Sequence, residues 1–148
     1  MIVRSGSAGE TRRFGIELAD RLRPDGTALL FGDLGSGKTV LTQGIAEGLG
    51  VDAGFVQSPT FTLIHEYDRG PVRLVHVDLY RLQPEEVEGI GLDEVLAGDG
   101  VKVVEWADRL PYRVAATEVR LEVGRKPGER TIEVAWDRCR VPHLNEGG

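Results

Sequence analysis

The chain has 148 residues, of which 41% are hydrophobic and 28% charged, the size and balance of one soluble globular domain. Its net charge of −6 argues against a general nucleic-acid-binding surface. No apolar run has the length of a membrane span, and the first residues lack a signal-peptide core, so we expect a cytoplasmic protein. The single cysteine, Cys139, excludes an internal disulfide and a cysteine-based metal cluster. We predict one domain over residues 1–148, with a frayed tail at 140–148.

The first predicted element is an amphipathic helix that ends near Leu22. Ser7 and Glu10 have the spacing of a capping box, in which a serine caps the first turn. Apolar residues recur on one helix face up to Leu22, and the Pro-Asp-Gly sequence at 24–26 ends the helix. Thr11 lies in the first turn, where an ordinary threonine would be an exposed surface residue.

A phosphate-binding loop is predicted at residues 32–39, between a strand and a helix. The sequence Gly-Asp-Leu-Gly-Ser-Gly-Lys-Thr matches the pattern G-x-x-x-x-G-K-[ST] at each fixed position. Residues 27–31 are apolar and of strand length, and residues 40–49 have a helical period and are followed by Gly50, which can end a helix. The glycines allow backbone N–H groups to approach an anion, which the amino end of the helix also attracts. We expect Lys38 to face the outer phosphates and the Thr39 hydroxyl to bind Mg²⁺.

Two later strands end in carboxylates. Residues 63–67 and 72–78 form a predicted antiparallel hairpin around a turn at 68–71, which makes the sheet a mixed one. The second strand ends in Asp78, and an Asp at such a position holds Mg²⁺, directly or through water, in phosphate-loop NTPases. We interpret His76, in the middle of this strand, as a core or hairpin-face histidine rather than a ligand.

Residues 101–106 form the other strand, which ends in Glu105 next to Trp106. If this strand lies beside the strand at 27–31, Glu105 points towards the γ-phosphate, where it could bind Mg²⁺ or orient the attacking water. The alternative is a strand-end glutamate in solvent.

The remaining elements complete the predicted fold. A short helix begins at Pro84, and several glycines divide the region up to residue 100 into short pieces. A terminal hairpin is predicted from the alternating segments 118–123 and 131–136. Together the elements predict an α/β, phosphate-loop NTPase-like three-layer fold with a mixed, mainly parallel central sheet and antiparallel hairpins.

Four blocks of the sequence resemble the TsaE family, also called YjeE. They are the phosphate loop at 32–39, Ser-Pro-Thr-Phe-Thr-Leu-Ile-His-Glu-Tyr at 58–67, His-Val-Asp-Leu-Tyr-Arg-Leu at 76–82 and Val-Glu-Trp at 104–106. The first block is generic, whereas the second and third in this order and spacing are specific. The resemblance implies a Mg²⁺-dependent ATPase, slow on its own, that is needed to make threonylcarbamoyladenosine in tRNA.

The same resemblance implies protein partners. TsaB and TsaD would act with this chain, TsaD would carry the transferase site, and ATP hydrolysis would reset that machinery between rounds. Contact with tRNA would be indirect, through the complex, and no membrane is implied. Two alternatives from other classes stay open: a small-molecule or nucleoside kinase, and a nucleotide-gated binding module in which hydrolysis is incidental.

Roles are carried over from the family residue by residue. Lys38 matches its phosphate lysine, Asp78 its essential acid, and Thr39 and Glu105 its Mg²⁺ site. The predicted catalytic residues are therefore Lys38, Asp78 and Glu105, and the predicted metal ligands are Thr39, Asp78 and Glu105. Trp106 matches a tryptophan beside the family's site. The residues predicted to bind nucleotide are Thr11, Asp33, Leu34, Gly35, Ser36, Gly37, Lys38, Thr39, Val40, Thr60 and Arg130.

Three of these residues lie outside the loop. Thr60, in a switch-like segment, is a candidate to sense the γ-phosphate, and Thr11 and Arg130 are candidates for the adenine side. The second half of the chain lacks an Asn/Thr-Lys-x-Asp element that would read guanine, so ATP is favoured. No arginine can be assigned to stabilise the transferred phosphate, although Arg81 and Arg109 are candidates. We therefore expect a partner to supply or order the missing part and to raise the turnover rate.

Overall fold

The computed structural model describes residues 1–52, 64–68 and 70–137. Cys139, the predicted tail at 140–148 and the switch-like segment with Thr60 lie outside the described residues. The described part forms one seven-stranded sheet in the order β1-β7-β6-β2-β5-β4-β3. The strands are β1 (Ile2–Ser5), β2 (Thr27–Phe31), β3 (Ile64–Tyr67), β4 (Leu74–Asp78), β5 (Val101–Glu105), β6 (Thr117–Val123) and β7 (Arg130–Ala135).

Four adjacent strands form the parallel centre of the sheet. β6, β2, β5 and β4 run in the same direction, while β7 and β3 pair antiparallel with their neighbours. β1 pairs antiparallel with β7 and so runs with the centre. The sheet is therefore mixed and mainly parallel, and both predicted hairpins are confirmed. β5 lies directly beside β2, which is the arrangement on which the predicted role of Glu105 depends.

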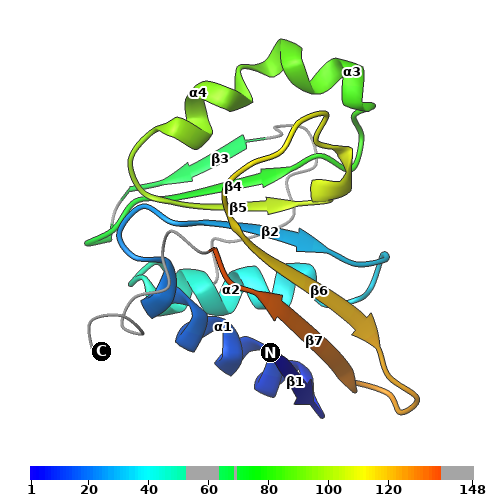
Figure 1. Cartoon of the computed structure of the whole chain (residues 1–148). Coiled ribbons are helices and arrows are strands. Elements are labelled where there is room, and N and C mark those ends of the chain that lie inside the picture. The colour runs from blue at the N-terminus through cyan, green and yellow to red at the C-terminus, as the bar shows by residue number, and fades with distance from the viewer. Residues whose placement is uncertain (53–63, 69, 138–148) are drawn as a thin grey trace, which may run out of the picture.

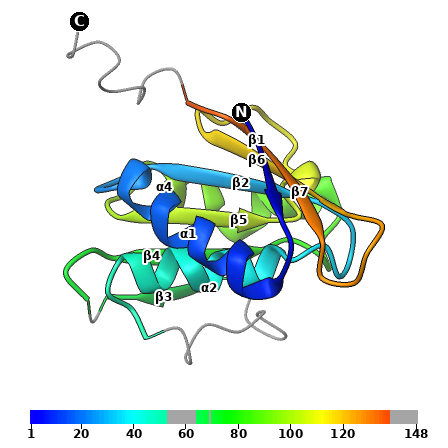
Figure 2. The same ribbon diagram turned by 90° about the horizontal axis from the view of Figure 1, so that it is seen from below.

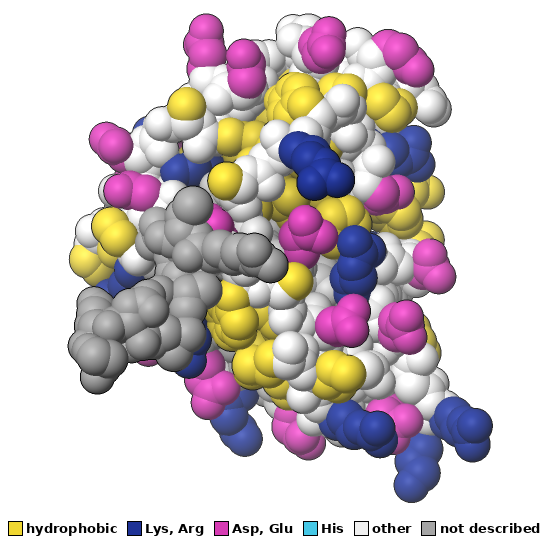
Figure 3. Space-filling model, viewed as in Figure 1, with side chains coloured by type: hydrophobic (Ala, Val, Ile, Leu, Met, Phe, Trp, Pro, Cys, Tyr) yellow, Lys and Arg dark blue, Asp and Glu magenta, His cyan; other side chains and the backbone are white. Residues whose placement is uncertain are grey.

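Helices cover both faces of the sheet, which confirms the three-layer arrangement (Figures 1 and 2). The helices are α1 (Ala8–Leu22), α2 (Lys38–Gly48), α3 (Pro84–Val87) and α4 (Leu92–Ala97), with 3-10 turns η2 (Glu88–Ile90) and η3 (Ala107–Arg109). One buried apolar cluster lies under α1 and α2, and a second lies under α3 and α4. The acidic side chains of α3 and α4 project into solvent (Figure 3). None of the helices in the described residues is both long and apolar enough to span a bilayer.

The amino end of α1 is capped as predicted, with one difference. The Ser7 hydroxyl accepts a hydrogen bond from the Glu10 N–H at 3.1 Å, whereas the Glu10 carboxylate accepts from the Gly6 N–H at 3.3 Å rather than from Ser7. Thr11 is buried, so its interpretation as an exposed helix residue is wrong. The reason is that Ser5, at the end of β1, lies against it and shares a 2.7 Å hydrogen bond with its hydroxyl.

α1 and α2 approach each other closely at a glycine. A Cβ atom on Gly44 would lie 2.1 Å from the carbonyl oxygen of Arg12, a distance that no side chain can tolerate. Glycine thus lets the two helix backbones meet directly, and the contact fixes α2 against α1. Because α2 begins at Lys38, this packing also fixes the position of the phosphate loop's last residues.

Candidate nucleotide and metal site

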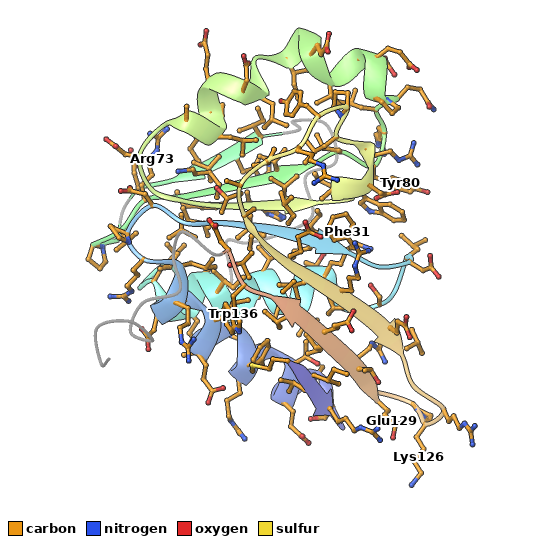
Figure 4. All side chains as sticks on the ribbon, viewed as in Figure 1. Phe31, Arg73, Tyr80, Lys126, Glu129 and Trp136 are labelled. Carbon is orange, nitrogen blue, oxygen red and sulfur yellow. The ribbon has the colours of Figure 1, made fainter. Side chains whose placement is uncertain are left out.

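The candidate site lies where the parallel strands β2, β4 and β5 end. In Figure 4, Phe31 at the end of β2 and Tyr80 after β4 mark this edge of the sheet, and Arg73, just before β4, marks the opposite edge. Ligands of parallel α/β sheets bind at the carboxyl ends of the strands. The loop at 32–37, the start of α2 and the last residues of β4 and β5 all meet at this edge.

The phosphate loop has the backbone of an anion cradle. Gly37 caps α2 with a φ of +103°, a conformation that favours glycine, and among the described residues no side chain caps this helix end. The first N–H groups of a helix lack partners within it, and its amino end attracts negative charge. The Ser36 N–H donates to the Asp33 carbonyl at 3.0 Å, which closes the turn of the loop. The geometry therefore suits a phosphate group at the start of α2.

Lys38 lies folded over this loop and is 5% exposed. Its ammonium group donates to the carbonyl oxygens of Gly32 and of Asp33, the latter at 3.0 Å, and lies 4.1 Å from the centre of the Trp106 ring. Burial lowers the pKa of Lys38, while nearby carboxylates, Glu105 foremost, act in the opposite direction. The ammonium group is thus held by two uncharged carbonyl oxygens and an aromatic ring. Phosphate oxygens, which are charged, bind a cation more strongly and can take the place of these contacts.

Glu105 and Asp78 lie side by side at the ends of β5 and β4, where they are register partners. Both are buried, so the alternative of a strand-end glutamate in solvent is wrong for Glu105. Asp78 accepts a hydrogen bond from the Tyr80 N–H at 2.9 Å. Burial raises the pKa of Asp78; the Tyr80 hydrogen bond lowers it, and Glu105 raises it further.

The donor set around Thr39 fits a magnesium ion. Thr39 Oγ1 donates to Glu105 Oε1 at 3.4 Å, and Asp78 adds a second carboxylate next to Glu105. Mg²⁺ takes hard oxygen ligands, commonly one or two carboxylates together with substrate phosphates and water. Adjacent ligands of an octahedral Mg²⁺ lie about 2.9 Å apart, so the hydroxyl and the carboxylate could serve the same ion with little movement.

His76 is the site residue that sequence reasoning missed. The prediction of a core histidine is confirmed, because the side chain is fully buried in β4. Its contact was not predicted: Nε2 lies 2.5 Å from Glu105 Oε2. The signal was present in the sequence, since His76 and Asp78 alternate onto one face of the strand, but the contact follows only when β5 is known to lie beside β4.

Arg130 and Thr11, the adenine-side candidates, both lie beside the phosphate loop. Arg130 donates from Nε to the Ser36 carbonyl at 2.9 Å and from Nη2 to the Gly35 carbonyl at 3.0 Å. A Cβ atom on Gly37 would lie 3.6 Å from Arg130 Nε and 3.9 Å from Thr11 Cγ2. Their contact with a base stays a prediction, whereas the contact of Arg130 with the loop itself is a finding.

Comparison with known proteins now decides the family. The sequence model of the family described as "Threonylcarbamoyl adenosine biosynthesis protein TsaE" matches residues 5–132. The chain belongs to the TsaE family. It is 40% identical to a Nostoc sp. protein named tRNA threonylcarbamoyladenosine biosynthesis protein TsaE, over 90% of this chain and 85% of the relative. It is also 40% identical to the Bacillus subtilis protein of the same name, over 86% of this chain and 78% of the relative.

A solved structure supports both the family and the fold. The crystal structure of Bacillus subtilis YdiB matches with a TM-score of 0.75 and 33% identity, over 99% of this chain and 92% of that one. The resemblance that four sequence blocks predicted is therefore confirmed. The roles of the individual site residues, and the binding of ATP and Mg²⁺, stay predictions.

Proposed function

We propose that this TsaE-family protein is a magnesium-dependent ATPase of tRNA threonylcarbamoyladenosine biosynthesis, acting with TsaB and TsaD and not itself transferring the threonylcarbamoyl group. The observation that carries the proposal is the convergence of four groups at one edge of the sheet. Lys38 and Thr39 come from the start of α2, Asp78 from β4 and Glu105 from β5. Phosphoryl transfer needs this combination of a phosphate-binding cation, a metal site and a carboxylate for the water.

Each group has a role that follows from its position. Lys38 and the loop N–H groups bind the outer phosphates, and Thr39 and Glu105 hold Mg²⁺, since Oγ1 and Oε1 already lie together. When bound, the metal neutralises negative charge on the phosphates. Asp78 accepts a hydrogen bond from the Tyr80 N–H with one oxygen, and its other oxygen orients the attacking water. Water then forms a bond to the γ-phosphorus as the bond to the ADP oxygen breaks, and the proton that the water loses passes through the Asp78 carboxylate to solvent as phosphate leaves.

We expect slow hydrolysis by the isolated chain because Arg109 already contacts other groups of the chain. Arg109, one of the two candidates, donates to the Leu82 carbonyl at 3.3 Å and lies 6.0 Å from the Trp106 ring. A missing arginine finger lowers phosphoryl transfer by roughly 10³- to 10⁵-fold. TsaB and TsaD would therefore raise turnover by supplying or ordering this charge.

The test is ATP turnover by the purified chain, alone and with TsaB, TsaD and tRNA, with Glu105→Ala in parallel. We expect slow phosphate release, stimulation by the complex, and a loss of about 100-fold or more in the variant, with nucleotide binding retained. Glu122→Ala, at an exposed glutamate on β6, is the matched control and should hydrolyse ATP normally. Tight ATP binding without release under any condition would refute the ATPase and favour a nucleotide-gated binding module. Transfer of phosphate to an acceptor would favour a kinase.

A further inference from the structure

We infer that His76 is a positioning residue for Glu105, fixing its carboxylate so that one oxygen is presented to Thr39 and the metal. The inference rests on the proposed function, because it takes Glu105 as a ligand of Mg²⁺. It goes beyond that function by assigning a role to a buried histidine that touches neither nucleotide nor metal.

The two oxygens of Glu105 have different partners. Oε2 lies 2.5 Å from His76 Nε2, on the buried side, and Oε1 lies 3.4 Å from Thr39 Oγ1, on the side of the phosphate loop. Without His76 only Oε1 would be held, by Thr39, and the carboxylate could rotate about its last bond. With Oε2 bound to His76 as well, both oxygens are held and Oε1 stays directed towards Thr39. The histidine thus sets the orientation in which the second oxygen can meet a metal.

The support for this contact is rigid. His76 is fully buried and Glu105 is 2% exposed, and both side chains come from adjacent parallel strands in the centre of the sheet. In the register His76 lies opposite Val103 and Asp78 opposite Glu105, so the imidazole reaches Glu105 diagonally across the two strands. Groups held by strands are positioned more exactly than groups held by loops, which is what a metal ligand requires.

The positioning role requires one tautomer of His76. As a metal ligand Glu105 is a carboxylate, which can only accept hydrogen bonds, so Nε2 of His76 must carry the proton that is donated to it. The other ring nitrogen, Nδ1, is buried and has no hydrogen-bond partner among the described residues. With the proton on Nδ1 instead, the ring would have no donor for Glu105. The contact with Glu105 is therefore the hydrogen bond that this buried imidazole makes.

The chain provides a matched histidine. His65 on β3 lies directly opposite His76 in the antiparallel register, but its Nδ1 contacts the Tyr67 hydroxyl at 3.3 Å. Substitution of His65 therefore changes a histidine on the adjacent strand without touching the Glu105 carboxylate.

Two amide substitutions separate positioning from simple packing. His76→Gln places its amide nitrogen as many bonds from the backbone as Nε2, so it can still donate to Glu105. His76→Asn places its amide nitrogen at the level of Nδ1, too short to reach. Removing a hydrogen-bonded partner of a metal ligand costs about 10- to 100-fold in metal affinity or activity. We expect His76→Asn to raise the Mg²⁺ concentration for half-maximal turnover about tenfold and to lower kcat. The KM for ATP at saturating Mg²⁺ should stay within about twofold.

His76→Gln should recover most of this loss, and His65→Asn should behave like the unsubstituted protein. Two further readouts do not depend on hydrolysis. The first is a Mg²⁺ titration of the ATP-bound protein followed by the fluorescence of Trp106, in a Trp136→Phe background. The second is the nitrogen NMR spectrum of the ligand-free protein, which should show the His76 proton on Nε2 and lose its hydrogen-bonded shift in Glu105→Ala.

The outcomes distinguish the two proposals. Absence of ATP turnover in the unsubstituted protein would refute the ATPase, while the fluorescence titration and the NMR spectrum would still judge His76. An unchanged Mg²⁺ requirement in folded His76→Asn, or a His76 proton on Nδ1, would overturn the positioning role. If His76→Asn does not fold, His76→Gln and the NMR spectrum decide. A Mg²⁺ requirement of His76→Gln near that of the unsubstituted protein supports the positioning role. A Mg²⁺ requirement as high as that of Glu105→Ala overturns it.

Discussion

Two buried lysines lie at opposite ends of the central strands, and each donates hydrogen bonds to two backbone carbonyls. Lys38, beyond the end of β2, binds the carbonyls of Gly32 and Asp33. Lys102, paired with the first residue of β2, binds the carbonyls of Asp25 at 3.1 Å and Gly98 at 2.6 Å. They are 5% and 2% exposed.

Lys38 and Lys102 make similar contacts but lie in different surroundings. Lys38 lies at the carboxyl end of the strands, where the amino end of α2 and the glycine loop prepare a site for an anion. Lys102 lies at the amino end, where its bonds tie the turn before β2 and the residues before β5 to the sheet. Burial of a cation is thus compatible with either a functional or a structural role, and its position along the strands decides which one it has.

The largest expected effect comes from removing the Lys38 charge. Lys38→Met keeps the apolar stem but deletes the cation that, in the proposed function, faces the outer phosphates, so ATP affinity should fall by about 100-fold, or about 2.7 kcal/mol. The free energy of unfolding without nucleotide should change little, because the cost of burying the Lys38 cation, which lowers its pKa, offsets the hydrogen bonds that it donates. Calorimetric titration of ATP and urea denaturation of the same preparation would measure both. A variant that binds ATP as before would remove Lys38 from the phosphate site.

Lys102→Met should show the opposite pattern. It deletes two charge-assisted hydrogen bonds to the Asp25 and Gly98 carbonyls, so the free energy of unfolding should fall by about 2 kcal/mol. ATP affinity should be unaltered, because the folded protein still has its phosphate loop intact. Urea denaturation is the main measurement, with calorimetry as the control. Equal losses of stability and of ATP affinity would show that the two ends of the sheet are not separate in function.

Arg130 offers a test at the functional end, with a smaller effect. Its guanidinium binds the Gly35 and Ser36 carbonyls, holding the outside of the loop while Lys38 faces the inside. Arg130→Met should weaken ATP and inorganic tripolyphosphate equally, by about tenfold, because the loop loses an external support. A loss confined to ATP would instead indicate contact with the adenine. The control is Arg120→Met, since Arg120 lies in the same hairpin over the Phe31 ring, at 4.3 Å.

The fold could be predicted well because its elements are marked locally. The loop motif fixes where β2 ends and α2 begins, the Ser7 cap fixes the start of α1, and alternating residues mark the hairpins. Strand order, by contrast, is set by contacts between distant segments. That β5 lies between β2 and β4 is stated nowhere in the sequence, and the diagonal contact between His76 and Glu105 depends on it.

The candidate site was predictable where chemistry requires a residue type. Lys38, Thr39, Asp78 and Glu105 were predicted because phosphate and Mg²⁺ need cations, hydroxyls and carboxylates at strand ends, and the structure brings the four residues together. Supporting residues carry no such marker. Burial of Thr11 and the contact of Arg130 with the loop carbonyls depend on the placement of β1 and β7, which only the assembled sheet provides.

The smallest expected change in stability concerns Asp78, where a gain in stability accompanies a loss of activity. Burial raises the folded-state pKa of Asp78 above its unfolded value, so the folded protein binds more protons in the window between the two. The free energy of unfolding therefore falls as pH rises through this window, and at neutral pH the ionised carboxylate weakens the fold. Asp78→Asn cannot ionise but can still accept from the Tyr80 N–H.

Asp78→Asn should therefore be more stable than the unsubstituted protein at pH 7 and equal to it at a pH below the ordinary aspartate value, while its ATP turnover is lost. Thermal unfolding across this pH range, with EDTA and without nucleotide, measures the effect. Asp93→Asn, at an exposed acid of α4, is the control and should not reproduce the gain. A less stable Asp78→Asn at pH 7 would show that the ionised carboxylate supports the fold. We would then have to abandon the contrast between the two ends of the sheet, in which a charged group lowers stability at the carboxyl end of the strands and raises it at the amino end.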